Sequence, residues 1–424
     1  MTPTQALDRA FRDDRAAVLA TVIRYVGDFE VAEEAVQDAF LAAVASWTRD
    51  GVPASTRAWL LTAARRRAVD RVRRARSTAE RAARWGQDPT FGSGVTGGAE
   101  LDAVETAVDE PDDAGLVDDR LRLIFTCCHP ALDVPGRVAL TLRTLGGLTT
   151  TEIARAFVVA EPTMGKRIVR AKRKIADARI PYRVPSATEL PGRLQGVLQV
   201  VYLIFNEGYS AHAGDQLVRA DLCAEALRLG RLLAELLPAD AEVLGLLALM
   251  ELHDARREAR VDAAGRYVPL PEQDPSRWDG ARLDAGRAAL ARAAALAGPG
   301  KYQLHAAITE LHVRGVETGH PDWARIAGLY DLLAVVAPSP VVEVNRAAAI
   351  GFAHGPDAGL QVLGPLLDDP VLDRYQPLHA TRADLLRRAG DPDGAARAYR
   401  RAIELSNNTV ERDELESRLR HLTT

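Results

Sequence analysis

The side chains best suited to act on another molecule are cationic and lie on one predicted helix. Between Glu161 and Ile175 the apolar residues recur at intervals of four, three and four, so they form one buried stripe: Met164, Ile168, Ala171 and Ile175. The positions that point elsewhere supply a hydroxyl and four positive charges: Thr163, Lys166, Arg167, Arg170 and Lys172. Side chains of these types bind the phosphates and base edges of nucleic acid rather than catalyse a reaction.

A shorter helix and a turn are predicted just before this basic helix. Thr149 or Thr150 can cap the shorter helix, and Glu152 lies in its first turn. The turn falls around residues 158–161, and Pro162 suits the first turn of the second helix. The pattern predicts a helix-turn-helix whose second helix enters the major groove of DNA. An ordinary helical hairpin with a solvated basic face is the alternative.

A second basic segment lies nearer the N-terminus, in residues 56–76. Its eight arginines are opposed only by Asp70: Arg57, Arg65, Arg66, Arg67, Arg71, Arg73, Arg74 and Arg76. So much positive charge on one helix is self-repelling unless a polyanion lies nearby. Nucleic-acid phosphates are the simplest partner, and a solvated arginine-rich helix is the alternative.

Acidic residues occupy one face of the helix predicted over residues 29–47, and they fill a later segment. The face carries Glu33, Glu34, Gln37 and Asp38 and suits either solvent or a basic partner helix. Residues 85–119 contain no Lys or Arg and ten Asp or Glu, with several glycines between them. Composition of this kind predicts a flexible acidic linker, which we place at residues 78–117.

The order of these segments resembles a known family. The sequence GDFEVAEEAVQDAF is followed by RAWLLTAARRRAVDRVRR, then the linker, then a helix-turn-helix that ends in GKRIVRAKRKI. This arrangement resembles the extracytoplasmic-function sigma factors of bacterial RNA polymerase, and DRLRLIFTCCHPAL resembles their subgroup with a long C-terminal helical extension. The resemblance implies an all-α fold with region 2 at 6–77, region 4 at 118–182 and a tetratricopeptide-like extension at 190–424.

The resemblance also implies roles for particular residues. Core polymerase would be bound through its clamp helices by Glu33, Glu34, Gln37 and Asp38, and through its flap by region 4. The promoter −10 element would be held and opened by Arg57, Trp59, Arg65, Arg66, Arg73 and Arg74. The −35 element would be bound by Thr163, Lys166, Arg167, Arg170 and Lys172.

The sequence departs from the family pattern at two of these places. Arg66 stands where the family often has Asn, and Gly165 stands where a longer side chain is common, so the preferred promoter bases are not implied. Trp59 has two interpretations, stacking on a DNA base or packing in the core. The family performs no catalysis, and we expect neither a cofactor nor a metal.

The C-terminal half shows weak internal repeats. The sequence RAAAIGFAHGPDAGLQVL from Arg346 returns as RADLLRRAGDPDGAARAY from Arg382, a shift of 36 residues. This period is typical of tetratricopeptide repeats, whose arrays bind partner proteins, so a regulatory protein is one expected partner. Residues 261–279 interrupt the pattern with prolines and predict a short β-hairpin or a contact loop. A polar cluster at Asn206, Glu207, Tyr209, His212 and Asp215 predicts a structural turn rather than an active site.

Composition limits the remaining possibilities. The 424 residues carry a net charge of −4 and only three cysteines, which fits a reducing cytoplasm. There is no apolar run of about 18 residues and no N-terminal apolar signal core, so we expect a cytoplasmic protein without a membrane segment. Cys127, Cys128 and His129 lack a second ligand pair for zinc. The rivals to a sigma factor are an operator-binding regulator with a sensing repeat domain and a helical scaffold or enzyme.

Overall fold

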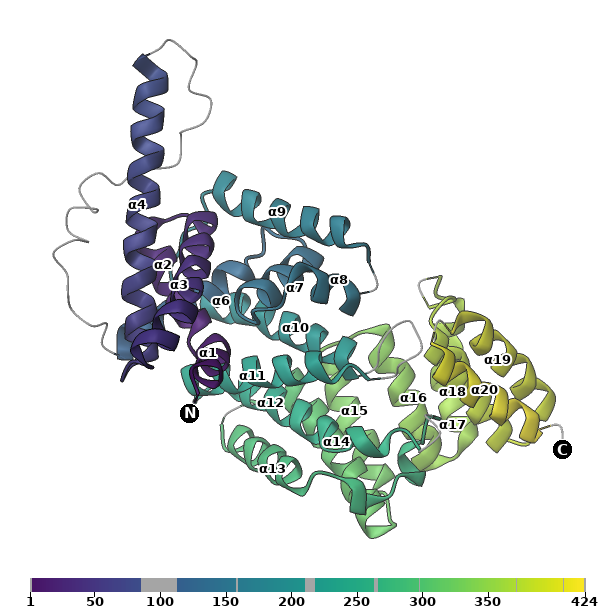
Figure 1. The fold of residues 1–424 in the computed structure, drawn as a ribbon. Coiled ribbons are helices and arrows are strands. Elements are labelled where there is room, and N and C mark those ends of the chain that lie inside the picture. The colour runs from purple at the N-terminus through teal and green to yellow at the C-terminus, as the bar shows by residue number, and fades with distance from the viewer. Residues whose placement is uncertain are drawn as a thin grey trace. The chain divides into compact units, whose positions relative to one another are not determined.

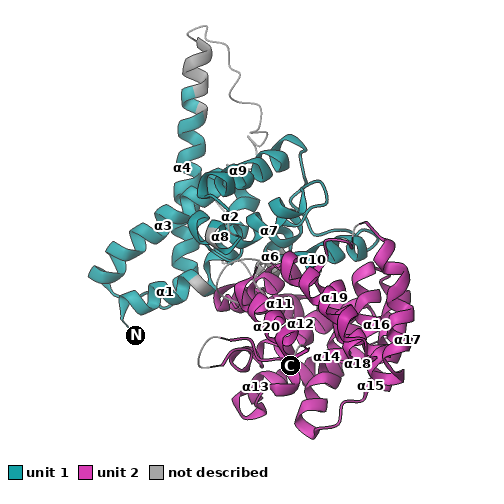
Figure 2. Ribbon diagram, turned by 90° about the vertical axis from the view of Figure 1, so that its right-hand side faces the viewer, with its two compact units in different colours: residues 1–200 teal, residues 201–424 magenta. Residues whose placement is uncertain are grey.

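The computed structural model describes residues 2–84, 113–157, 159–209, 218–262, 266–296, 298–370, 372–406 and 408–422. Over these residues the secondary structure consists of α-helices and short 3₁₀ turns, without a β-strand (Figure 1). The all-α prediction is therefore confirmed. The chain divides into two compact units, Met1–Val200 and Val201–Thr424 (Figure 2).

The first unit begins with four helices whose ends follow from the local sequence. Thr2 and Gln5 form a reciprocal capping box at the start of the first helix. Gly27, in the left-handed conformation at φ 69°, ends the second helix, and the side chain of Asp28 caps the third. The helices are α1 (Pro3–Asp13), α2 (Arg15–Val26), α3 (Phe29–Asp50) and α4 (Thr56–Arg84).

The helix-turn-helix follows in the same unit, and its prediction is confirmed. The Thr149 Oγ1 accepts a bond from Glu152 N, and Thr149 N donates to the Glu152 carboxylate. All four residues of the predicted stripe, from Met164 to Ile175, are buried. The helices here are α6 (Asp113–Cys127), α7 (Val134–Thr144), α8 (Thr150–Ala156) and α9 (Glu161–Asp177).

The segment assigned to the linker is helical at both of its ends. Helix α4 continues to Arg84, and α6 begins at Asp113, whereas the sequence predicted a linker over residues 78–117. The extension of α4 has a simple cause, since RSTAERAAR is rich in Ala and Arg, which favour helix. The middle of the predicted linker, residues 85–112, lies outside the described residues.

The second unit consists of helices that pack against their neighbours in sequence. Helix α10 (Leu190–Tyr209) crosses the boundary between the units, and the hairpins that follow belong to the second unit alone. They are α11 (Ala220–Leu236), α12 (Ala241–Asp254), α13 (Gly280–Ala294), α14 (Lys301–Thr318), α15 (Trp323–Val336), α16 (Pro340–His354), α17 (Pro356–Leu363), α18 (Gln376–Arg388), α19 (Pro392–Leu405) and α20 (Thr409–Leu422).

The repeat seen in the sequence is a repeat of helical hairpins. Helices α16 and α17 begin at Pro340 and Pro356, and α18 and α19 begin 36 residues later, at Gln376 and Pro392. The second helix of the later hairpin is capped by Asp391, whose side chain accepts a bond from Gly394 N. The second unit is therefore a tetratricopeptide-like array, as predicted.

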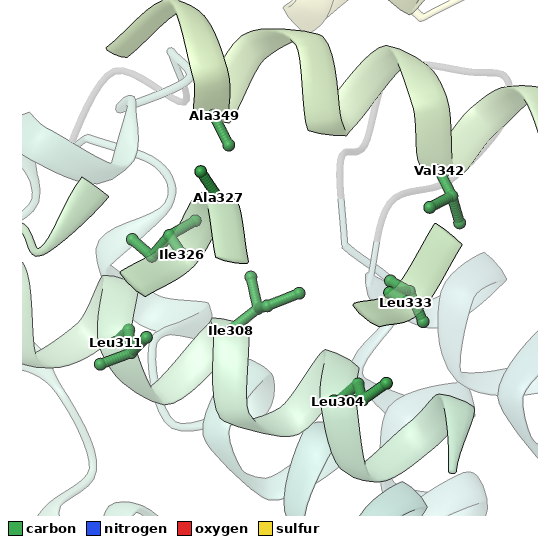
Figure 3. Packing of buried hydrophobic residues seen from close by; sticks show 8 residues of the cluster. All are labelled: Leu304, Ile308, Leu311, Ile326, Ala327, Leu333, Val342 and Ala349. Atoms are coloured by element: carbon green, nitrogen blue, oxygen red, sulfur yellow. The ribbon is translucent and has the colours of Figure 1, made fainter. Parts of the chain in front are cut away.

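Apolar side chains from consecutive helices form the core of this array. Figure 3 shows one such cluster, in which α14, α15 and α16 contribute Leu304, Ile308, Leu311, Ile326, Ala327, Leu333, Val342 and Ala349. Helices α12 and α14 cross closely at Gly245, where an added Cβ would lie 2.5 Å from Gln303 N. Each hairpin thus buries its apolar face against the next one.

The interruption predicted at residues 261–279 is present, but no strand forms in its described part. A single antiparallel bridge joins Val261 to Tyr267, and residues 263–265 lie outside the described residues. The 3₁₀ turns η1 (Arg257–Ala259), η2 (Leu270–Glu272) and η3 (Pro275–Arg277) surround it. Asp279 N donates to Ala255 O at 2.9 Å. This bond joins the end of the interruption to the residue that follows α12. Within the described residues, no helix is both long and apolar enough to cross a membrane.

Candidate nucleic-acid and polymerase interface

Helix α9 presents its predicted DNA-binding residues on the side away from its buried stripe. Thr163, Lys166 and Arg170 are exposed, and Arg167 is half-buried. Among the described residues, none of these four side chains forms a hydrogen bond or ion pair. Cations held on a rigid helix without internal carboxylate partners are available to phosphates and base edges.

Lys172 differs from the other four predicted −35 residues. Its Nζ lies 2.5 Å from Oε2 of Glu33, and the two side chains are only 13% and 14% exposed. The other carboxylate oxygen of Glu33, Oε1, is buried without a hydrogen-bond partner. One predicted DNA-binding cation and one predicted polymerase-binding anion are therefore bonded to each other.

The other two carboxylates predicted to face the polymerase, Glu34 and Asp38, are both bonded to one arginine of α4. Arg71 donates from Nη1 to Glu34 at 2.5 Å and from Nη2 to Asp38 at 2.6 Å. The hydrogen bond to Asp38 raises the pKa of Arg71. Gln37 on the same face is exposed. The sequence did not reveal this pairing, because Glu34 and Arg71 are 37 residues apart.

The basic residues of α4 fall into a packed group and an exposed group. Arg57 bonds Asp14, whose carboxylate is 10% exposed, at 2.8 Å. Arg65 donates to the Tyr25 hydroxyl at 2.5 Å and stacks on that ring at 4.0 Å, and desolvation by burial lowers its pKa. In contrast, Arg66, Arg73 and Arg74 are exposed.

The ambiguous tryptophan of α4 packs inside the first unit. Trp59 is half-buried and meets the buried Trp47 edge-to-face, with the ring centroids 5.7 Å apart. This contact is of the kind expected for a core residue. Stacking of Trp59 on a base stays a prediction.

The helices before and after the linker segment are joined by polar contacts that the sequence did not predict. Arg15 donates to the Thr144 carbonyl at 3.0 Å, and Tyr182 donates to the Ala20 carbonyl at 2.8 Å. Arg24 pairs at 2.9 Å with Asp119, whose side chain is wholly buried. Asp119 belongs to the run that we interpreted as acidic spacer, so composition concealed its structural role.

Two adjacent cysteines at the end of α6, Cys127 and Cys128, are buried thiols. The Cys127 and Cys128 sulfurs lie 3.7 and 3.5 Å from the hydroxyls of Thr144 and Thr141. Burial raises the pKa of Cys128 to about 11, so the thiol stays protonated near neutral pH. No group of three metal-ligating side chains is found in the part of the chain that the structure describes. His212 and Asp215, which belong to the polar cluster predicted to form a structural turn, lie outside that part.

Two family models match the segments that carry these surfaces. Residues 10–78 match sigma-70 region 2, and residues 122–175 match sigma-70 region 4. SigK of Mycobacterium bovis (strain BCG / Pasteur 1173P2), an ECF RNA polymerase sigma factor, is 32% identical over 162 residues, which cover 38% of this chain and 79% of SigK. The chain belongs to the extracytoplasmic-function (ECF) sigma factors. The region 2 match argues against the operator-binding regulator, since such a regulator needs no sigma region 2.

Other relatives extend the comparison of this sigma factor. The probable ECF RNA polymerase sigma factor SigI of Mycobacterium tuberculosis (strain CDC 1551 / Oshkosh) is 29% identical over 187 residues, covering 44% of this chain and 60% of SigI. An uncharacterised protein of Rhizobium meliloti (strain 1021) is 40% identical over 424 residues, all of this chain and 97% of that protein. The long C-terminal extension is thus shared with the Rhizobium meliloti protein.

Two further matches are of a more general kind. Residues 193–294 match a family of unknown function. The crystal structure of yeast Tom70 aligns with 99% of this chain and 84% of its own, at 14% identity and a TM-score of 0.36. Sigma factors as a family are non-enzymatic transcription factors, and the sigma domains of this chain imply RNA polymerase and promoter DNA as partners.

Proposed function

We propose that this sigma factor directs core RNA polymerase to two-part promoters, with region 2 (6–77) at the −10 element and region 4 (118–182) at the −35 element. The observation that carries the proposal is the unpaired cationic face of α9 above a fully buried stripe, in the segment that matches region 4. Lys166 and Arg170 are the exposed long cations of that face, so they would read base edges. Thr163 and Arg167 would bind phosphate, and Lys172 would do so once its ion pair with Glu33 opens.

Region 2 would bind both the −10 element and the polymerase. Arg66, Arg73 and Arg74 are exposed on α4 and would hold the separated strand through its phosphates. Arg57 and Arg65 are engaged within the protein, so they would position α4 unless their contacts open. The acidic face of α3, with Glu33, Glu34, Gln37 and Asp38, would meet the clamp helices of the largest polymerase subunit, and region 4 would meet the flap.

The experiment that tests this function is run-off transcription with purified core polymerase and a library of promoter fragments. We expect initiation at a shared two-part motif only when the sigma factor is present. Arg170→Ala should lower initiation at that motif, whereas Arg173→Ala, an exposed arginine of the same helix outside the predicted set, should leave it nearly unchanged. Initiation without the sigma factor, or equal loss in both variants, would contradict the proposal.

We further propose that the extension at residues 190–424 regulates the sigma domains, in cis or by receiving a regulatory protein. A repeat array with its own packed core is suited to bind a protein surface. The fragment 1–200 is the proper comparison, because Arg193 of α10 donates to the Phe125 carbonyl inside the first unit. Equal transcription by the fragment and the full chain, in vitro and in cells, would remove the regulatory role.

A further inference from the structure

A groove of about 1190 Å³ in the second unit is lined mainly by alternate helices of the repeat array. Most of its lining residues belong to α14, α16, α18 and α20, whereas α15 and α19 contribute Trp323 and Tyr399. From His312 on α14 the lining residues recur at i, i+3, i+4 and i+7, and from Glu414 on α20 they recur in the same way. The groove is therefore one face of the array, built from one helix of each successive hairpin.

Small residues on three of these helices leave room in the groove for another main chain. Ala348 on α16, Ala380 on α18 and Ser417 on α20 line the groove and are each half-buried. Side chains this short allow a second backbone to come close to the helices. Neighbouring helices lie roughly 8–10 Å apart, so the four lining helices span about 27 Å, which is the length of about eight extended residues.

An aromatic pair gives part of the lining an apolar surface. The rings of Trp323 and Phe352 stack with their centroids 4.2 Å apart, and Phe352 is 40% exposed. Leu270 and Val316 line the same groove. A bulky apolar side chain of a partner would cover this surface and remove it from water.

The carboxylates of the lining differ in their partners. Asp384 is bonded to Arg387 at 2.7 Å, and Glu414 is bonded to Arg418 at 2.8 Å. Glu272 is exposed and forms no hydrogen bond or ion pair through its side chain within the described part of the chain. Glu272 is therefore the carboxylate of this lining that is available to a cation from outside.

The size and the polar groups of the groove suit a peptide better than a small molecule. Its volume exceeds the roughly 300–1,000 Å³ of pockets that hold small molecules. Thr381 and Ser417 line the groove with half-buried hydroxyl groups, which both donate and accept, and the exposed Arg387 donates. A main chain carries one donor and one acceptor at almost every residue, so it would find partners for both along the groove.

We infer that this groove binds an extended peptide segment of a partner protein, one that carries a bulky apolar residue and, within a few positions of it, a Lys or Arg. The apolar residue would lie against Trp323 and Phe352, and the cation would pair with Glu272. Main-chain hydrogen bonds would supply affinity, and these two side-chain contacts would supply specificity. The inference deepens the proposed regulatory role of the extension and rests on it, since it names the chemistry of the regulatory protein.

The test is an array of random nine-residue peptides probed with the fluorescently labelled full-length protein. We expect the bound peptides to be enriched in large apolar residues with Lys or Arg nearby. Glu272→Lys should replace Lys and Arg by Asp and Glu in the bound set, and it should weaken the best wild-type peptide roughly tenfold in anisotropy titrations, because an attraction becomes a repulsion. The matched control is Asp284→Lys, at an exposed acidic residue of α13 outside the groove lining, which should select the wild-type set.

A proline scan of the best peptide tests its conformation. An extended chain accepts Pro at most positions, whereas a helix accepts it only in its first turn. We therefore expect most Pro variants to bind within a few-fold of the parent peptide. Loss of more than tenfold at most central positions would identify a helix as the occupant and overturn the extended conformation.

Three results on the array would overturn the inference. They are no enrichment by the wild type, enrichment of acidic peptides by the wild type, and the same altered selection in Asp284→Lys as in Glu272→Lys. Because the array contains neither polymerase nor promoter, these failures leave the proposed sigma function untouched. Conversely, a selected peptide that binds as expected but leaves run-off transcription unchanged would contradict the regulatory role while keeping the groove as a peptide site.

Discussion

Lys172 on α9 is bonded to Glu33 on α3, with Nζ 2.5 Å from Oε2 and both side chains largely buried. The helix predicted to enter the −35 major groove is thus tied to the helix predicted to face the polymerase. Arg15, Arg24 and Tyr182 make further contacts between the same two groups of helices. If Glu33 and Lys172 engage the polymerase and DNA, this contact has to open first, so the pair links the two binding events.

Exchanging the two charges separates the structural role of this pair from its binding role. The double variant Glu33→Lys with Lys172→Glu keeps an ion pair, so its free energy of unfolding should stay near that of the wild type. Either single variant places two like charges in a poorly hydrated site and should cost about 3 kcal/mol. Run-off transcription by the double variant should fall sharply, because each binding surface has a reversed charge. Normal transcription by a stable double variant would exclude both residues from the interfaces.

Arg57 and Arg66 on α4 should respond in opposite ways to truncation. Arg57→Ala leaves the buried Asp14 carboxylate without its charged partner and should lower the free energy of unfolding by about 2 kcal/mol. Arg66 is exposed, so Arg66→Ala should change stability by less than about 0.5 kcal/mol while weakening binding to a −10 single strand. Urea unfolding and strand-binding titrations measure the two effects. Equal destabilisation by both variants would contradict the assignment.

The sequence predicted those features that depend on local patterns. The stripe from Met164 to Ile175 follows from helical spacing, and the hairpin period of 36 residues follows from a repeated sequence. The all-α class follows from both. These signals are short-range, so they could be read before any tertiary contact was known.

The pairing of charges could not be predicted in the same way. Lys172 lies outside the buried stripe of α9, as the exposed cations do, yet it is bonded to a residue 139 positions away. Asp119 looked like part of an acidic spacer, and it is a buried partner of Arg24. Composition records charges but not their partners.

The exposed cations of α9 should be visible in the salt dependence of promoter binding. Each phosphate contact adds about −0.9 to the slope of log binding constant against log salt concentration. Arg167→Ala, which removes a proposed phosphate contact, should reduce the slope by roughly one and weaken all promoter sequences alike. Arg170→Ala should instead cost about 1–3 kcal/mol at one base position. Binding titrations of the holoenzyme at several salt concentrations distinguish the two patterns, and the reverse assignment would show the opposite pair of results.

The neutral histidines of α14 should make the second unit sensitive to mild acid. The pKa of His305 and of His312 is about 4 in the folded chain, below the unfolded value of about 6.5. Between these values the unfolded state binds more protons, so stability is present above about pH 6.5 and falls as the pH drops toward 4, by up to about 1.4 kcal/mol per pH unit for each ring. Urea unfolding at pH 7.5 and 5.5 measures the loss. His305→Gln and His312→Gln should each reduce it, and His320→Gln, at an exposed site, should not. An unchanged pH dependence in both buried-site variants would show that these rings are protonated freely in the folded chain.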